Sequence, residues 1–181
     1  MVGCATLREA AALRRVEFRL DRVSDAEVVR IRLDPLPTYR SLTAAQIARL
    51  GVGVATRDVP FGFTLHLEGR NPQSNQVAAR MIALGWSYRV DDREILNGRL
   101  DQPLRFPPGQ AVDVPVAIEF NLYRFFGGDA RTLFETAAAL AGQAGGRHDV
   151  EVRLTPRIDT PIGPMDYPTP ITIRLASADA G

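Results

Sequence analysis

The sequence predicts a fold dominated by β-strands, an antiparallel β-sandwich with two short helices. Most of the chain consists of short segments in which apolar and polar residues alternate, which is the pattern of strands with one buried face. Clusters of Asn, Asp, Pro and Gly separate these segments. The two segments with helical spacing lie between strand pairs and do not follow each strand in turn, so the pattern favours a sandwich over a βαβ fold.

Two strands and a helix open the predicted domain. Residues 16–20 and 29–33 alternate, and Ser24-Asp25 between them is typical of a turn. Residues 34–37 end the second strand because their prolines cannot donate a ladder hydrogen bond. Residues 43–51 then predict a short helix, with a capping box at its start and a glycine at its end. A nucleic-acid recognition helix is disfavoured there, because the segment carries a single basic residue.

The central strands follow a rigid corner. Residues 61–67 alternate strictly and end at Asn71-Pro72, where proline fixes its own φ and the asparagine side chain can bond nearby backbone. From Val77 to Val90 the chain is predicted to be extended, with one apolar face. That face consists of Ile82, Leu84, Trp86, Tyr88 and Val90.

Three turn signals organise the next stretch. Asp91-Asp92 predicts a hairpin turn into a return strand at residues 95–100. Asn97-Gly98 within that strand suggests a bulge or a tight bend. The third turn, Pro107-Pro108-Gly109, leads into the strand at residues 112–122.

The last part of the chain predicts a second helix and two closing strands. Pro115 in the preceding strand favours an edge position or a bulge there. Asp129 is expected to cap the helix, and Gly142 to Gly146 to end it. Strands are predicted at residues 150–154 and 171–175, whereas the five prolines between Thr155 and Pro170 argue against regular structure.

Composition describes an ordinary soluble globular chain. It has 181 residues, of which 45% are apolar and 24% charged, with a net charge of +1. This balance indicates no general attraction to nucleic acid or to an anionic membrane. The basic residues are all arginine, a bias that a GC-rich genome explains most simply. Without lysine, Schiff-base and P-loop lysine chemistry is excluded.

The first residues suggest a lipid anchor. Met1-Val2-Gly3-Cys4 resembles the end of a bacterial lipoprotein signal, in which Cys4 would become the lipidated first residue. The alternative is an ordinary cysteine in a frayed terminus. Residues 1–14 are therefore expected to be a tether or signal remnant, and residues 15–176 a single domain. One cysteine cannot form an intrachain disulfide, and no apolar run approaches the roughly 20 residues that span a bilayer.

The central stretch resembles the water-stress and hypersensitive-response (WHy) domain of LEA14-like, group 2 late-embryogenesis-abundant proteins. The resemblance covers about residues 55–175. It rests on FTLHLEGRNP, on the tyrosine-bearing strand that follows and on FPPGQAVDVPVAI; the late segment TPIGPMDYPTPITIRL resembles the family's closing hairpin. The matching positions are Asn71, Pro72, Tyr88, Asn97, Gly98, Pro108 and Gly109.

The resemblance implies an immunoglobulin-like or fibronectin-III-like sandwich, a link to desiccation or other stress, and no catalysis. A bacterial member with a lipobox-like start would lie in the cell envelope, in agreement with the interpretation of Cys4; otherwise a cytoplasmic location is expected. Two helical segments, one before Phe61 and one after Phe125, depart from the family pattern. The exact strand order therefore stays open.

Catalytic and metal-binding patterns are weak in this sequence. The two histidines, His66 and His148, have no motif partner, and surface roles are expected for both. The chain has neither HExxH nor ligand spacing for zinc, so no metal and no cofactor are predicted. Calcium at Asp91, Asp92 and Glu94 is a minor alternative. Phe125-Phe126 could contact a membrane or a client, although packing onto the sandwich is the simpler interpretation.

Two functional hypotheses follow. The first is a non-enzymatic, stress-associated envelope lipoprotein that acts through surface contacts with membrane or protein clients and does not bind nucleic acid. The second is an envelope binding or assembly module that carries an apolar ligand between sheet and helix. Trp86 and Tyr88 are expected to be core residues, with an exposed aromatic platform as the alternative.

Overall fold

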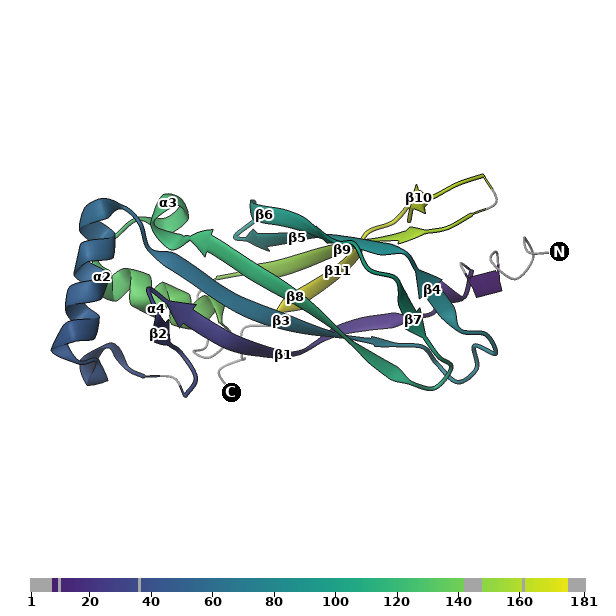
Figure 1. Cartoon of the computed structure of the whole chain (residues 1–181), viewed down its shortest axis with the longest axis horizontal. Helices are drawn as coiled ribbons and strands as arrows, with labels where there is room; N and C mark the ends of the chain where they lie inside the picture. The colour runs from purple at the N-terminus through teal and green to yellow at the C-terminus, as the bar shows by residue number, and fades with distance from the viewer. Residues whose placement is uncertain (1–7, 10, 36, 142–147, 161, 176–181) are drawn as a thin grey trace. The chain divides into compact units, whose positions relative to one another are not determined.

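The computed structural model describes residues 8–9, 11–35, 37–141, 148–160 and 162–175 (Figure 1). It confirms the predicted fold class, β-dominated with minor helix. The strands are β1 (Glu17–Val28), β2 (Ile31–Arg32), β3 (Pro60–Arg70), β4 (Ala79–Met81), β5 (Ala83–Val90), β6 (Arg93–Leu100), β7 (Leu104–Phe106), β8 (Ala111–Asn121), β9 (Val150–Ile158), β10 (Met165–Asp166) and β11 (Ile171–Leu175). The helices are α2 (Ala44–Thr56), α3 (Leu122–Phe126) and α4 (Ala130–Leu140), with a 3₁₀ turn at Tyr39–Ser41.

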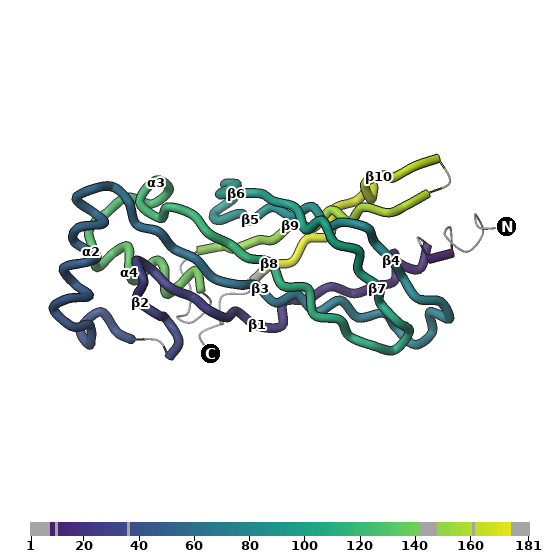
Figure 2. Tube along the Cα trace, in the orientation of Figure 1, coloured from purple at the N-terminus to yellow at the C-terminus, as the bar shows by residue number. Residues whose placement is uncertain are grey.

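The described strands form three sheets. One sheet has the order β2-β1-β3-β8, the second has the order β10-β9-β5-β6 with β11 also on β9, and β4 pairs with β7 in a two-stranded ribbon. The pairs β1–β2, β4–β7, β5–β6 and β9–β10 are antiparallel. Figure 2 shows β1, β3 and β8 side by side along the trace. Because β8 is the last strand of its sheet, the edge position predicted from Pro115 is confirmed.

The chain divides into two compact units, which are described separately below. Unit 1 consists of Met1–Asp21, His66–Pro115 and Glu151–Arg174. Unit 2 consists of Arg22–Leu65, Val116–Val150 and Leu175–Gly181. Five strands, β1, β3, β8, β9 and β11, contribute residues to both units, so each unit contains pieces distant in sequence. The expected single domain over residues 15–176 remains a prediction.

The core of unit 1 draws on all three sheets. Leu67 of β3, Leu84 and Tyr88 of β5, Phe106 of β7 and Val152 of β9 are all fully buried. Of the apolar face predicted for residues 77–90, Leu84, Tyr88 and Val90 are buried as expected, whereas Ile82 and Trp86 are half-buried. Each large apolar side chain removed from water contributes about 2 kcal/mol, so these alternating positions dominate the stability of the unit.

The core of unit 2 combines helices with the other half of β3. Leu50 of α2, Phe61 of β3 and Phe134 of α4 are buried, and Figure 1 shows α2 beside α4. Helix α3 packs through Phe125, whose ring centre lies 5.6 Å from that of Phe120. This edge-to-face contact confirms the packing interpretation of Phe125.

Two sequence predictions about the first strands are wrong. Strand β1 continues through Ser24-Asp25, with Asp25 at φ 53°. The chain turns instead at Val29 and Arg30, which have φ 42° and 63°, and Val29 donates its N–H to Pro60 on β3 at 2.8 Å. The polar pair Ser24-Asp25 therefore marks a left-handed residue within β1 and not a turn. The pairing of β1 with the distant strand β3 determines where β1 ends.

Three other boundaries also differ from prediction. The extended stretch from Val77 to Val90 is split at Ile82, because β4 pairs with β7 and β5 pairs with β6. The register shift in the hairpin lies at Tyr88/Arg89 opposite Ile95, and Asn97-Gly98 is in regular pairing. Strand β9 continues to Ile158 and β10 follows it, so the proline-rich segment contains regular structure at the sheet edge.

The observed helix ends agree with some of the sequence predictions and differ from others. Thr43 forms the predicted capping box with Gln46, but α2 continues through Gly51 and ends at Arg57, which has φ 57°. Gly53 is the glycine that packing requires, because a Cβ there would lie 2.9 Å from the carbonyl oxygen of Asp58. Helix α3 was not predicted, since its first residue, Leu122, completes the alternation of β8 and five residues are too few to show a helical period.

The predicted N-cap of α4 is confirmed, and its contribution to stability depends on pH. Asp129 accepts a hydrogen bond from the backbone N–H of Thr132 at 2.8 Å, and this bond lowers the pKa of the carboxyl group below its ordinary 3.8. Because the folded pKa is the lower one, the cap's contribution is complete above the unfolded value and is lost as pH falls through the folded value.

We therefore expect Asp129→Asn to reduce the loss of stability in acid. Wild type should lose more of its unfolding free energy than the variant as pH falls below about 4, because only the wild-type cap is protonated there. Urea unfolding at several pH values measures the difference. Parallel pH profiles for the two proteins would contradict the capping role, and Asp159→Asn serves as an exposed control.

Candidate functional site

The Asn-Pro corner is a buried hydrogen-bond centre in unit 1. Asn71 is fully buried, and its Nδ2 donates to the carbonyl oxygens of Phe106 at 2.8 Å and Val77 at 3.2 Å. Its Oδ1 accepts from Nδ2 of Asn75 at 2.7 Å. A buried amide with every partner in place fixes one geometry, because losing a partner leaves a polar group without water.

The predicted turn at Pro107-Pro108-Gly109 is bonded to this corner. The backbone N–H of Gly109 donates to the carbonyl of Asn71 at 2.8 Å, and that of Asn71 donates to Gln110 at 3.2 Å. Gly109 has φ 73°, a left-handed conformation that favours glycine. The structure thus joins the Asn71-Pro72 corner to the Pro108-Gly109 turn at the ends of β3 and β8.

Asn75 extends the same network to the start of the chain. It is 5% exposed, and its Nδ2 also donates to the carbonyl oxygen of Ala12 at 2.9 Å. Nearby in sequence, Nε of Arg14 donates to the hydroxyl of Tyr167 at 2.9 Å. Sequence analysis did not single out Asn75, although an asparagine four residues after the Asn of an Asn-Pro pair was the available signal.

Two further residues of the resemblance, Tyr88 and Gly98, have packing roles in the β5–β6 hairpin. Tyr88 is fully buried, and burial raises the pKa of its hydroxyl. Gly98 pairs with Trp86, and a Cβ on Gly98 would lie 2.4 Å from Cζ2 of the indole. Because Gly98 has no side chain, the Trp86 indole has room to lie across the hairpin. Tyr88 is placed in the core as expected.

A histidine–carboxylate pair lies on the β3–β8 sheet. Nδ1 of His66 is 2.9 Å from Oδ2 of Asp113, and the side chains are 14% and 48% exposed. Neither residue lines the surface groove over Gly62 and Ala117 or the groove beside residues 74–77. His148 instead packs its ring on Phe126, at 5.4 Å between ring centres. Among the described residues, no group of three or more His, Cys, Asp and Glu side chains could hold a metal ion.

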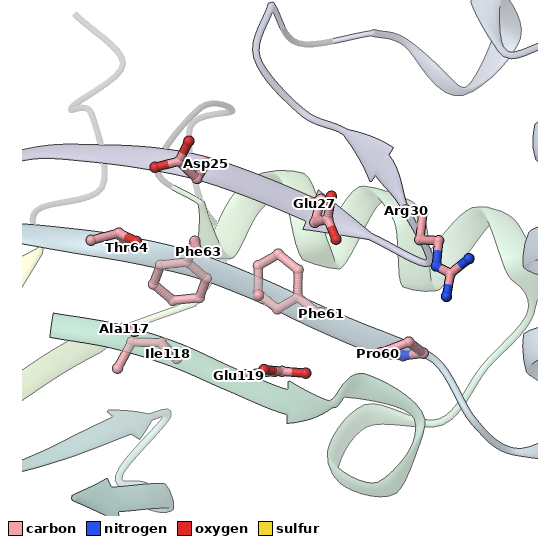
Figure 3. Close-up of a pocket in the computed structure, with 11 residues that line it drawn as sticks. Asp25, Glu27, Arg30, Pro60, Phe61, Phe63, Thr64, Ala117, Ile118 and Glu119 are labelled. Carbon is pink, nitrogen blue, oxygen red and sulfur yellow. The ribbon is translucent and has the colours of Figure 1, made fainter.

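A groove of about 520 Å³ lies on the outer face of unit 2's sheet, and Figure 3 shows the residues that line it. Its floor lies over the small residues Gly62 and Ala117, whose neighbours in sequence are buried on the opposite face. Its rim carries three carboxylates and one arginine, which are Asp25, Glu27, Glu119 and Arg30. The groove is therefore a polar surface feature of the sheet.

A smaller groove of about 340 Å³ lies in unit 1 beside the first described residues. Arg8 and Arg15 line one side, and residues 74–77 line the other. Within the described part of the chain, no helix is long and apolar enough to cross a membrane. The lipidation candidate Cys4 lies outside the described residues.

Comparisons with known proteins return distant structural likenesses. No family model and no curated protein matches the chain. The crystal structure of a protein from Archaeoglobus fulgidus is 11% identical over 62% of this chain and 82% of its own, with a TM-score of 0.36. The solution structure of a protein described as late embryogenesis abundant (LEA) is 18% identical over 93% of this chain and 75% of its own, with a TM-score of 0.38. At these values neither likeness bears on what this chain does.

Proposed function

We propose that this protein is a non-enzymatic, stress-associated protein of the LEA14-like (WHy) kind. It acts through contacts of its folded surface with protein or membrane clients when water is scarce. We further propose that Cys4 carries a lipid anchor that places the protein at the cell envelope. The proposal includes no cofactor, metal or nucleic acid.

The observation that carries the proposal is that the residues on which the family resemblance rests stabilise the fold. Asn71 and Gly109 join two strand ends, while Tyr88 and Gly98 are used in packing. These residues therefore support a scaffold. The features that remain for function lie on outer faces, where charged residues surround the unit 2 groove.

The apolar-ligand hypothesis predicts an apolar cavity open to solvent between sheet and helix. The larger groove is lined by β1, β3, β8 and the turn after β1, and its rim is charged. The smaller groove has two arginines in its wall. Neither groove supports an apolar carrier, so surface contact is the function that we favour.

Drying assays test this proposal directly. A dehydration-sensitive enzyme and dye-filled phospholipid vesicles are each dried with the protein or with an equal mass of serum albumin. We expect more enzyme activity, less dye leakage or both in the presence of this protein after rehydration. Protection no better than that by albumin in both assays would contradict the proposal.

Metabolic labelling tests the proposed anchor separately. The natural gene product is expressed in a bacterial host supplied with an alkyne fatty acid. We expect label and a diacylglycerol mass increment at Cys4 in the membrane fraction, and neither in Cys4→Ser. An unlabelled wild-type protein would remove the lipoprotein part of the proposal and leave the drying result unaffected.

A further inference from the structure

Two arginines lie directly opposite each other on the β4–β7 ribbon of unit 1. The antiparallel register pairs Arg80 with Arg105, and both side chains are exposed. Their neighbours Ala79, Met81 and Phe106 are fully buried on the other face. Directly opposed strand positions place Cβ atoms about 5 Å apart, so both guanidinium groups reach the same outer space.

This pairing is unfavourable for the protein alone, because like charges opposite each other across a ribbon repel. Several other strand arginines of unit 1 have carboxylate partners within 4.0 Å. Examples are Arg19–Glu68, Arg89–Glu151, Arg153–Glu151 and Arg157–Asp166. Within the described part of the chain, neither Arg80 nor Arg105 forms such a pair.

We propose that Arg80 and Arg105 form a clamp that binds a phosphate group between their guanidinium planes. Each guanidinium offers a planar fork of N–H donors that fits two oxygens of an oxyanion. A phosphate has enough oxygens to accept hydrogen bonds from both guanidinium groups, and its negative charge offsets the repulsion between them. A carboxylate has two oxygens and one charge, and so satisfies one arginine.

The ribbon makes the clamp more rigid than two arginines on a loop. Ladder pairing of Ala79 with Phe106 and of Met81 with Leu104 fixes the backbone on both sides of the arginines. Asn71 also holds the ribbon, through its hydrogen bond to the Phe106 carbonyl at 2.8 Å. A preorganised backbone reduces the ordering cost that usually makes exposed charge pairs weak.

The phosphate could be free or part of a lipid headgroup, and the two sources share this recognition chemistry. Binding at the clamp goes beyond the proposed stress function and stands without it, since drying assays do not measure it. If the phosphate belongs to a lipid, the clamp gives unit 1 a contact with the membrane surface.

The first arm of the test titrates inorganic phosphate into the full-length protein. Arginine Nε–Hε signals in ¹H–¹⁵N NMR spectra report the binding. We expect saturable shifts of the Arg80 and Arg105 signals, and about a tenfold weaker affinity in Arg80→Gln or Arg105→Gln. Arg70→Gln is the matched control, because Arg70 is an exposed arginine of unit 1 at the end of β3 with the same charge.

The second arm measures sedimentation of the same variants with phosphatidylcholine vesicles, with and without phosphatidylglycerol. Loss of binding to the anionic vesicles in the Arg80 and Arg105 variants, with retention in Arg70→Gln, assigns the phosphate to a lipid. Binding of inorganic phosphate without vesicle binding assigns it to a free phosphate. Both results support the clamp.

A charge reversal keeps the proposal falsifiable if a glutamine variant folds poorly. Arg80→Glu places a carboxylate opposite the Arg105 guanidinium across the ribbon, and we expect a higher melting temperature together with lost phosphate binding. The clamp would be overturned if Arg80→Glu bound phosphate as wild type does. It would also be overturned if Arg70→Gln lost as much binding, or if wild type showed no saturable binding in either arm.

Discussion

Asn71→Ala is expected to lower the free energy of unfolding by about 3 kcal/mol, because buried polar groups would lose their partners. In wild type the Asn71 amide serves the carbonyl oxygens of Val77 and Phe106 and accepts from Asn75. Alanine satisfies none of these groups. The backbone of residue 71, which bonds the turn at Gly109, is unchanged in the variant, so the loss reports the side-chain amide.

Urea unfolding followed by circular dichroism measures this effect. Asn97→Ala is the control, since Asn97 is exposed and its amide donates to Glu94 at the surface. The control should change stability by no more than about 0.5 kcal/mol. If the two asparagine variants unfolded at the same urea concentration, the corner would not be the centre of stability described above.

Gly69→Ala is the second change with a large expected effect, a loss of about 3 kcal/mol from overpacking. A Cβ at this position would lie 2.4 Å from Cε1 of Phe106 and 3.0 Å from Cε1 of Phe18. Phe106 is fully buried and meets Phe18 edge to face at 5.6 Å. The ring therefore has no open side to move into, and β3 or β7 must shift instead.

A second glycine and a double mutant provide the checks. Gly51→Ala in α2 meets nothing within 4 Å and should stabilise the protein by up to about 1 kcal/mol through helix propensity. Phe106→Leu should destabilise the wild type, yet combine with Gly69→Ala at less than the sum of the two losses, because the smaller side chain makes room. Additive losses in thermal unfolding would show that the methyl–ring collision is not the cause.

Local sequence signals predicted the parts of the fold that local chemistry decides. The alternation in residues 61–67 and 112–120 gave the two long strands of one sheet, because one buried face requires a period of two. Thr43 and Asp129 marked helix starts through side-chain hydrogen bonds to nearby backbone. Asn71-Pro72 was predicted as a corner, although its partners are 6 and 35 residues away.

The parts that escaped prediction depend on partners distant in sequence. Residues 81–84 are all apolar and show no boundary at Ile82, so only the two different neighbours of β4 and β5 separate these strands. Arg80 and Arg105 lie opposite each other because β4 pairs with β7, 25 residues along the chain. Neither arginine is part of a motif in its own segment. Leu122 was predicted to end a strand, yet it begins the helix Leu122–Phe126, in which the Asn121 side chain accepts a hydrogen bond from the N–H of Tyr123.

The edge strand β8 limits how this protein can behave when it is concentrated. Pro115 has no N–H to offer at the open side of the sheet, and Asp113 and Glu119 project charge from positions along the same strand. A second copy therefore cannot extend the sheet by continuous backbone pairing along this strand. When copies are crowded together, this strand therefore offers no continuous template on which another chain can pair.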